Sequence, residues 1–325
     1  MSKVAAAASP GPVSILRGHS YGASVVRFGG TLKNSTNVQS SVLISGDAGG
    51  FTLLWDSFTR DPALHAPRVA SGVTDVISMT EFEVCILDKS GVVHVWDLRS
   101  NKFLDRETIL SGRSLLDSVF QISPGFCRLA PRPMSSSNDS TQFASASGQD
   151  AMRLRITNRS VEGFYGMNES LQSVATMITS VGWLNERFLV SGDEGGSVTL
   201  WKYDEMLEVF EKQHSIESVS GSSEPILSFA GYQTESKSVV AYGGASGIVG
   251  ILELCASETE IGRENDIRVL KSTRLRRDGV SGLAWRSDGR IIASGCWDSC
   301  VRILDGRLDK PKSLLRPLAV LKYHS

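Results

Sequence analysis

The residues with the greatest capacity for metal binding or nucleophilic chemistry in this 325-residue chain are five histidines and five cysteines. Cys296 and Cys300 are four residues apart, a spacing that zinc sites use when a second pair of ligands completes the set. Neither a second cysteine pair nor a histidine lies close to them in the sequence. We therefore expect no metal site there, and the odd number of cysteines favours a reducing compartment.

Enzyme motifs are absent as well. The chain contains no Gly-x-x-x-x-Gly-Lys phosphate loop, no Gly-x-Ser-x-Gly elbow and no His-Glu-x-x-His pair. Glycines cluster between Gly243 and Gly250, but no helix is expected to follow them. A phosphate site of that type needs a helix N-terminus, so the cluster indicates a tight turn. We expect no enzymatic activity and no cofactor.

A repeated Trp-Asp pair indicates the elements that the chain forms. Leu53–Asp56 (LLWD) is followed 41 residues later by His94–Asp97 (HVWD), and each copy comes after a glycine-containing turn. A third copy ends at Trp201, where Lys202 replaces the aspartate. A Trp-Asp pair that closes a short apolar strand, with a period of roughly 40 to 45 residues, is typical of WD40 propeller blades. Three further segments keep the pattern without tryptophan: Met152–Ile156, Ile248–Leu252 and Cys300–Leu304.

Two more strand-like segments precede each of these six strands, so six units of at least three strands fit the chain. The sequence predicts an all-β WD40 β-propeller over residues 12–325, after a disordered tail over residues 1–11. Within it, Asp204–Lys212 and the basic run Arg268–Arg277 are expected to be outer strands. The expected first strands of the units are Ser24–Phe28, Val73–Met79, Phe126–Leu129, Thr179–Leu184, Pro225–Phe229 and Gly279–Trp285.

WD40 blades often contain a polar network in which histidine, serine and a turn aspartate satisfy the tryptophan indole. His19, Ser45 and Trp55 fit this set, but Gly49 occupies the position six before the tryptophan where we expect the acid. Asp298 keeps an acid at that position, but its unit has lost both the tryptophan and the histidine. The sequence therefore predicts incomplete networks and a divergent propeller held mainly by apolar packing between blades.

Composition excludes several classes of partner. The formal net charge is −1, which creates no field for nucleic acid or anionic membranes. No apolar run approaches the roughly 20 residues that a membrane helix needs. Propellers usually bind proteins through the loops at their faces. We therefore expect protein partners, with no small-molecule substrate, no direct nucleic-acid binding and no membrane.

Several stretches carry a more specific resemblance: Asp117–Val119 with Gly125–Arg128, Glu224–Leu227, Arg290–Asp298, Pro317–Leu321, and the opening Val13–Gly18. With these residues the chain resembles the ASTRA-associated protein 1 family, whose animal member is called G-protein β-subunit-like protein 1. The resemblance implies a non-catalytic scaffold that acts with the Tel2-Tti1-Tti2 co-chaperone assembly in the stability of phosphatidylinositol 3-kinase-related kinases. It also implies a chromatin-linked complex and a location in nucleus and cytoplasm.

The most specific parts of the resemblance are our candidate protein contacts: Gly125, Phe126, Cys127, Arg128, Trp297 and Asp298. The stretch Leu115–Pro131 resembles the family yet interrupts the repeat spacing. It is expected to be a contact surface or, equally well, a packed irregular blade edge.

Two other classes of propeller remain as alternatives. Trp96-Asp97-Leu98-Arg99 fits the Trp-Asp-x-Arg ending of propellers that dock on the cullin-4 adaptor as substrate receptors, so Trp96, Asp97 and Arg99 are the alternative contact residues. A heterotrimeric G-protein β subunit would need an N-terminal coiled coil, and no heptads precede Val13.

The number of units predicts a ring that is one blade short of the family's seven. Val13–Arg17 is expected to be an outer strand for a last blade, and Leu318–Lys322 the outer strand of the sixth. His324-Ser325 would then open a seventh unit. The expectations are a truncated chain, favoured here, a ring that closes with six blades, or a blade supplied by a partner.

Overall fold

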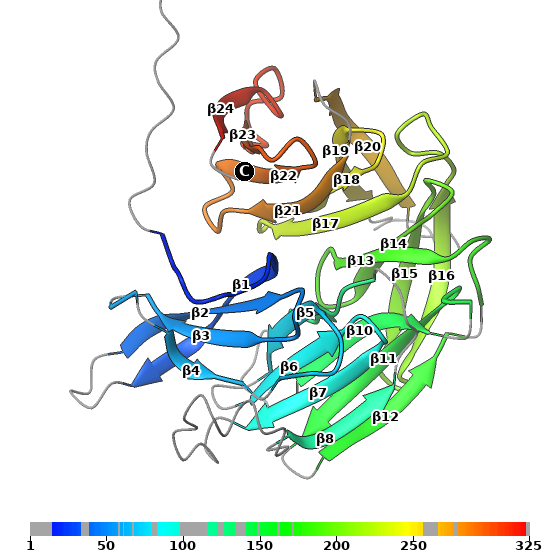
Figure 1. Ribbon diagram of the computed structural model, residues 1–325. Coiled ribbons are helices and arrows are strands. Elements are labelled where there is room, and N and C mark those ends of the chain that lie inside the picture. Colours follow the sequence, from blue (N-terminus) through cyan, green and yellow to red (C-terminus); the bar gives the residue numbers. More distant parts are fainter. Residues whose placement is uncertain are drawn as a thin grey trace, which may run out of the picture. The chain divides into compact units, whose positions relative to one another are not determined.

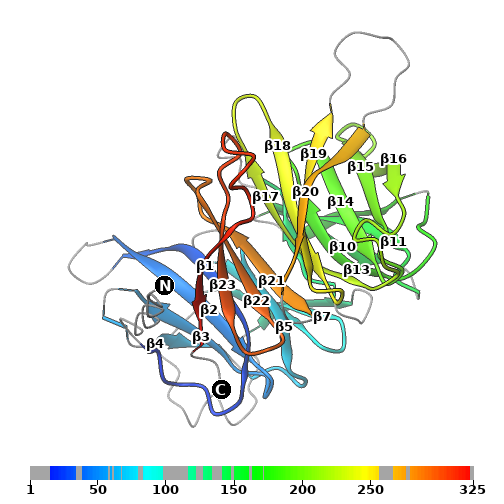
Figure 2. The same cartoon turned by 90° about the horizontal axis from the view of Figure 1, so that it is seen from above.

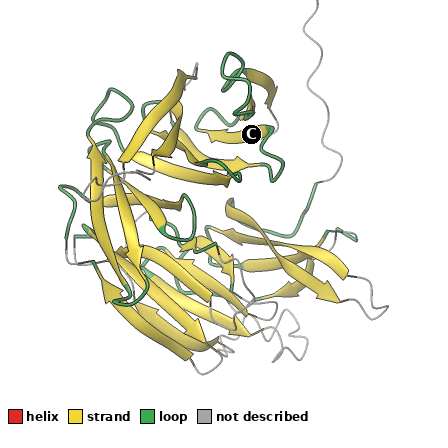
Figure 3. Ribbon diagram, turned by 180° about the vertical axis from the view of Figure 1, so that it is seen from behind, coloured by secondary structure: helices red, strands yellow, loops and turns green. Residues whose placement is uncertain are grey.

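The computed structural model describes residues 15–322, except 34–38, 58, 61, 67, 80–82, 98–115, 122–126, 134–140, 148–149, 161–162, 171, 256–265 and 276–278. All regular elements among these residues are β-strands (Figure 3). Within the described ranges, no helix has the length and apolar character needed to cross a membrane.

The strands form six four-stranded antiparallel sheets, which we call blades I to VI (Figure 1). Blade I contains β1 (Ala23–Lys33), β2 (Gln39–Asp47), β3 (Thr52–Asp56) and β4 (Pro62–His65). Blade II contains β5 (Val73–Ser78), β6 (Glu83–Asp88), β7 (Val92–Asp97) and β8 (Leu116–Gln121). Blade III contains β9 (Ala130–Pro131), β10 (Thr141–Ser147), β11 (Arg153–Ser160) and β12 (Gly163–Glu169).

Blade IV contains β13 (Ile178–Trp183), β14 (Phe188–Asp193), β15 (Val198–Asp204) and β16 (Val209–Ile216). Blade V contains β17 (Ile226–Gln233), β18 (Ser238–Gly244), β19 (Ile248–Cys255) and β20 (Asp266–Arg274). Blade VI contains β21 (Val280–Trp285), β22 (Ile291–Cys296), β23 (Val301–Asp305) and β24 (Pro317–Leu321). The strands of blades V and VI are also seen from above in Figure 2.

The chain divides into two compact units. One unit contains blades I to III, and the other contains blades V and VI with most of blade IV. In every blade the strands pair in chain order, so each is a simple meander. The six units predicted from the sequence are therefore confirmed.

The inner strands are apolar because both of their faces are covered, whereas the outer strands are polar. All residues of β3 and β6 are buried. β16 and β20 instead bury only Phe210 and Ile267 fully among their residues. This confirms that the end of Asp204–Lys212 and most of Arg268–Arg277 form outer strands, although Glu205–Glu208 form a turn before β16.

Successive blades within each unit are joined by apolar clusters. Residues of blades I and II share one cluster that includes Val25, Ile44, Val76, Ile86 and Trp96. A second joins β6 and β7 of blade II to Leu129 and Phe143. In the other unit, one cluster joins blades IV and V through residues such as Leu200 and Tyr242, and another joins blades V and VI through residues such as Val239 and Leu304.

A repeated tight turn connects the second and third strands of several blades. In blades I, II, IV and V the fourth residue of this turn is a glycine whose N–H donates to the carbonyl three residues earlier. These glycines have φ between 71° and 90°, a region that favours glycine because it has no Cβ. They are Gly50, Gly91, Gly196 and Gly247. The glycine cluster around Gly247 is thus a turn, as the sequence predicts.

One buried carboxylate links three blades. Asp75 of β5 is fully buried and accepts two hydrogen bonds from Arg27 of β1, at 2.9 Å from Nε and 2.7 Å from Nη2. The Leu129 N–H, just before β9, donates to the same carboxylate at 3.0 Å, and Arg27 Nη2 also donates to the Leu129 carbonyl. The innermost parts of blades I, II and III are therefore joined at a single charged centre.

Two strand predictions were wrong. Ile15–Arg17, the described part of the expected strand at Val13–Arg17, forms no strand. Instead it leads into a segment in which Gly18 lies against the Trp55 ring. Phe126–Leu129 was also expected to be a strand, but the short β9 begins after it, at Ala130. The Leu129 N–H bonds the Asp75 side chain rather than a strand partner.

Arg27→Ala should lower the free energy of unfolding by about 3–5 kcal/mol, because it leaves the buried Asp75 carboxylate without its counterion. Urea denaturation followed by circular dichroism measures the change. Arg286→Ala is the matched control, since it breaks the exposed Arg286–Asp288 pair and should change the free energy of unfolding little. Equal effects of the two substitutions would contradict the role assigned to Asp75.

Candidate functional site

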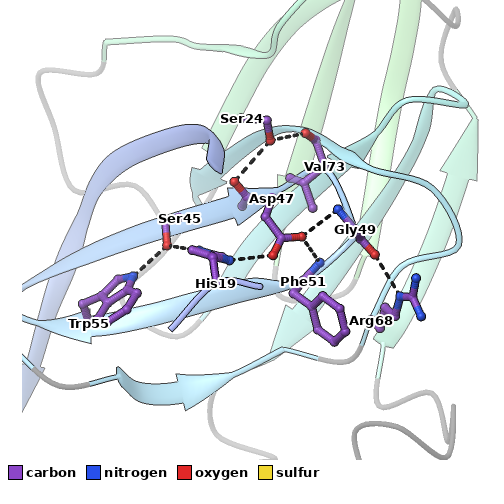
Figure 4. A network of polar contacts seen from close by, with 10 residues as sticks. His19, Ser24, Ser45, Asp47, Gly49, Phe51, Trp55, Arg68 and Val73 are labelled. Carbon is purple, nitrogen blue, oxygen red and sulfur yellow. Dashed lines mark hydrogen bonds and ion pairs between the residues drawn. The ribbon is translucent and has the colours of Figure 1, made fainter. Parts of the chain in front are cut away.

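The turn between β2 and β3 of blade I carries a continuous polar network (Figure 4). The Trp55 indole N–H donates to Ser45 Oγ at 2.7 Å, and Ser45 Oγ lies 2.6 Å from His19 Nε2. His19 Nδ1 lies 2.8 Å from Asp47 Oδ2. With Nδ1–H donating to the carboxylate, Nε2 accepts from the Ser45 hydroxyl, so each member has a partner.

Asp47 also fixes the turn itself. Its second carboxylate oxygen, Oδ1, accepts from the N–H groups of Gly49 at 2.9 Å and Phe51 at 3.0 Å. The carboxylate is fully buried, and the network therefore satisfies a charge that would be costly to leave unpaired. The same residue shapes the turn and holds the histidine.

The prediction that this network lacks its acid was wrong. The acid is Asp47, eight residues before Trp55, rather than a residue at position 49. Asp88 and Asp193 stand eight residues before Trp96 and Trp201, so this spacing was a signal in the sequence. The acid sits there because it is the last residue of the strand and caps the turn that follows.

The other tryptophan blades keep parts of the network. In blade IV the Trp201 indole donates to Ser191 Oγ at 2.8 Å, and Asp193 accepts from the Ser197 N–H at 2.8 Å. In blade II, burial raises the pKa of Asp88, but hydrogen bonds from Ser90, His94 and Val92 outweigh it and hold the pKa below its usual value. In blade II, Ile86 occupies the position that Ser45 has in blade I, so this position holds no serine that could accept from the tryptophan indole.

Three side chains stand over the blade I turn, and we call them the blade I tip cluster: Tyr21, Phe51 and Arg68. The rings of Tyr21 and Phe51 are stacked, with centroids 6.3 Å apart and planes 14° apart. The Arg68 guanidinium carbon lies 5.1 Å from the centroid of the Phe51 ring, and its Nε donates to the Gly49 carbonyl at 2.8 Å (Figure 4). Sequence reasoning missed this cluster, because its members come from three separate loops.

Blade I also exposes large apolar side chains on β1. Val26 is 55% exposed and Phe28 is 79% exposed. Phe28 pairs with Leu43, which pairs with Trp55, so these residues share the sheet face that carries the Trp55 network. The opposite face of the blade packs against blade II through Val25 and Ile44.

Half of the candidate contacts from the Gly125–Arg128 segment can be located. Gly125 and Phe126 lie outside the described residues. Cys127 is buried, and this burial raises the pKa of its thiol to about 12. Arg128 is half-buried. Of the wider stretch Leu115–Pro131, residues 116–121 form the outer strand β8 of blade II.

Trp297 and Asp298 form the turn between β22 and β23. Trp297 is 58% exposed, and its ring lies over Gly279, where any Cβ would overlap it. Asp298 accepts two hydrogen bonds from Arg302, at 2.9 and 2.5 Å, and these bonds lower the pKa of Asp298 to about 2. Asp298 therefore stabilises its own hairpin, in a blade whose third strand carries no tryptophan.

The alternative ligase-adaptor residues are only partly visible. Trp96 is fully buried in the cluster between blades I and II. Asp97 is the last residue of β7, and Arg99 lies outside the described residues.

Cys296 and Cys300 flank the Trp297 turn, and the N–H of Cys296 donates to the carbonyl of Cys300 at 3.0 Å. Within the described ranges, no three histidine, cysteine or acidic side chains are placed to hold a metal ion.

No protein-family model matches the chain. Guanine nucleotide-binding protein subunit beta-like protein 1 from Mus musculus is 20% identical over 330 residues, which cover 97% of this chain and 88% of the mouse protein. The protein named ASTRA-associated protein 1 in Verticillium alfalfae is 22% identical to this chain, over 97% of this chain and 77% of the relative. The protein of that name in Penicillium rubens is 23% identical, over 96% of this chain and 78% of the relative. The resemblance drawn from the sequence is thus confirmed.

Among solved structures, the chain is similar to the β-propeller domain of Cps50 (Swd1) from Myceliophteria thermophila. The TM-score is 0.64 and the sequence identity 17%, over 94% of this chain and 87% of that chain. At this identity the likeness concerns the fold alone. It confirms the predicted all-β WD40 propeller fold.

Ser45→Ala should destabilise the chain more than Ser191→Ala. Both substitutions leave a buried indole N–H without its acceptor, but Ser45→Ala also removes the partner of His19 Nε2. Each unsatisfied buried group costs about 1–3 kcal/mol. Urea denaturation of the two variants measures the difference, and equal losses would mean that the histidine contributes nothing to stability.

Proposed function

We propose that this chain is a non-catalytic WD40 scaffold that acts with a Tel2-Tti1-Tti2-type co-chaperone assembly in the stability of phosphatidylinositol 3-kinase-related kinases. The observation that carries the proposal is the similarity to proteins named ASTRA-associated protein 1, which extends over nearly the whole chain. Chromatin-linked complexes and a location in nucleus and cytoplasm belong to the same proposal.

The surface supports a role in protein binding. The blade I tip cluster joins tyrosine, phenylalanine and arginine, and the Trp297 turn exposes an indole in the other unit. Aromatic residues and arginine are enriched in the centres of protein interfaces. Aromatic rings bury large areas with few rotatable bonds, and the planar guanidinium of arginine offers several hydrogen-bond donors. The polar clusters nearby are occupied with holding turns, as Asp47 and Asp298 illustrate.

Affinity purification of the tagged chain from its own cells should recover homologues of Tel2, Tti1 or Tti2. A WD40 protein of unrelated sequence with the same tag is the control. Recovery of the cullin-4 adaptor in their place, with loss of that recovery on Arg99→Ala, would transfer the proposal to a ubiquitin-ligase substrate receptor.

Depletion of the protein should lower the abundance of several of these kinases together while their transcripts stay constant, because the assembly is proposed to act on the kinase proteins. Quantitative immunoblots and transcript measurements after rapid depletion test this, with re-expression of the chain as the control. Unchanged kinase abundance would contradict the kinase part of the proposal.

A further inference from the structure

We propose that the blade I tip cluster is a binding site for an acidic side chain of a partner peptide, with Arg68 as the anion-binding residue and Tyr21 as the adjoining apolar contact. This proposal rests on the protein-binding role of the chain, and it adds the kind of segment that a protein partner would present.

Arg68 has donors to offer. Its side chain is exposed, and its Nε donates to the Gly49 carbonyl. Neither terminal guanidinium nitrogen has a partner among the described residues. A guanidinium presents its terminal N–H groups as a planar fork, which matches the two oxygens of a carboxylate or two oxygens of a phosphate.

The exposed charges on the segments that build the cluster are positive. The three segments that build it, residues 15–22, 47–51 and 66–72, contain a single acidic residue, Asp47. That carboxylate is buried, and both of its oxygens accept hydrogen bonds inside the network. The exposed charges on these segments are Arg17 and Arg68, and the side chain of the exposed Lys89 from the adjacent blade II turn approaches Gly72. An anionic partner is therefore attracted and meets no exposed carboxylate on these segments.

The cluster is already ordered without a partner. The Gly49 carbonyl and the Phe51 ring hold the Arg68 side chain in place. The Tyr21 ring stacks on the Phe51 ring. Gly49 is required for this arrangement, because any Cβ there would overlap the Tyr21 ring. Side chains fixed before binding lose little conformational entropy on binding, which favours affinity.

The aromatic pair favours a peptide over a free anion. Tyr21 is 52% exposed and stacks on the same Phe51 ring that the Arg68 guanidinium contacts, so the cluster offers apolar area as well as the anion site. A peptide that places an acidic residue on Arg68 can lay a neighbouring apolar side chain on this ring. A small free anion gains only the guanidinium contact.

Fluorescence anisotropy with the full chain tests the site. The probe is the labelled peptide Gly-Glu-Glu-Phe-Glu-Glu-Gly, and its neutral counterpart carries glutamine in place of every glutamate. The acidic peptide should bind the unaltered protein, and Arg68→Ala should weaken binding at least tenfold, since about 1.5–3 kcal/mol for hydrogen bonds to a charged group corresponds to a factor of about 10 or more. Arg316→Ala, another exposed arginine, is the matched control and should leave binding unchanged.

Two further arms identify the chemistry. Arg68→Lys keeps the charge but loses the fork, so its affinity should fall between those of the unaltered protein and Arg68→Ala. A neutral peptide with one phosphoserine distinguishes a phosphate from a carboxylate; tighter binding of this peptide with the same dependence on Arg68 supports the site and assigns a phosphorylated partner.

Equal binding of the acidic and neutral peptides, or unchanged binding by Arg68→Ala, overturns the proposal. Its failure is distinct from failure of the proposed function. Recovery of the Tel2-type assembly without Arg68-dependent peptide binding removes the site and leaves the scaffold role. Arg68-dependent binding without recovery of that assembly keeps the site and removes the proposed partners.

Discussion

Within each compact unit, the structure depends on the burial of sheet faces against the neighbouring sheet. A four-stranded sheet cannot hide an apolar face by itself, so the clusters between blades supply the main stabilisation within each unit. This constraint explains why β3 and β6 are buried along their whole length and why β16 and β20 are polar. Polar groups on the inner strands must then be paired locally. Asp75 meets this need by accepting from Arg27 and from the Leu129 backbone.

The turn geometry that several blades share links this packing to the surface. An acid at the end of the second strand caps the turn in blades I, II and IV, and a glycine with positive φ closes it. In blade I the same acid also holds His19, which reaches the Trp55 indole through Ser45. Because the Asp47 carboxylate fixes the backbone of the turn, the side chains that pack on this turn are fixed as well. Phe51 and the Gly49 carbonyl together position Arg68.

The two candidate surfaces differ in character. At the blade I tip cluster, stacked rings and a guanidinium form a basic surface with no exposed carboxylate on its own segments. At the blade VI turn, Trp297 lies over Gly279 next to an aspartate that is already paired with Arg302. The first surface can receive an anion, whereas the second offers mainly apolar area. A scaffold with both can hold chemically different segments of its partners.

Particular stretches of sequence, such as Arg290–Asp298, carried the resemblance to ASTRA-associated protein 1. The repeat spacing by itself determined the number of blades and the positions of the inner strands, because these follow from local strand and turn patterns. It did not place the acid of the Trp55 network, since the relevant position depends on where the strand ends. It did not find the blade I tip cluster either. Tyr21, Phe51 and Arg68 are separated by 30 and 17 residues, and only the packing of three loops over one turn brings them together. Tertiary structure likewise decided that the Gly18 segment lies against Trp55 and that Cys127 is buried, because burial is a property of the neighbours that a residue meets.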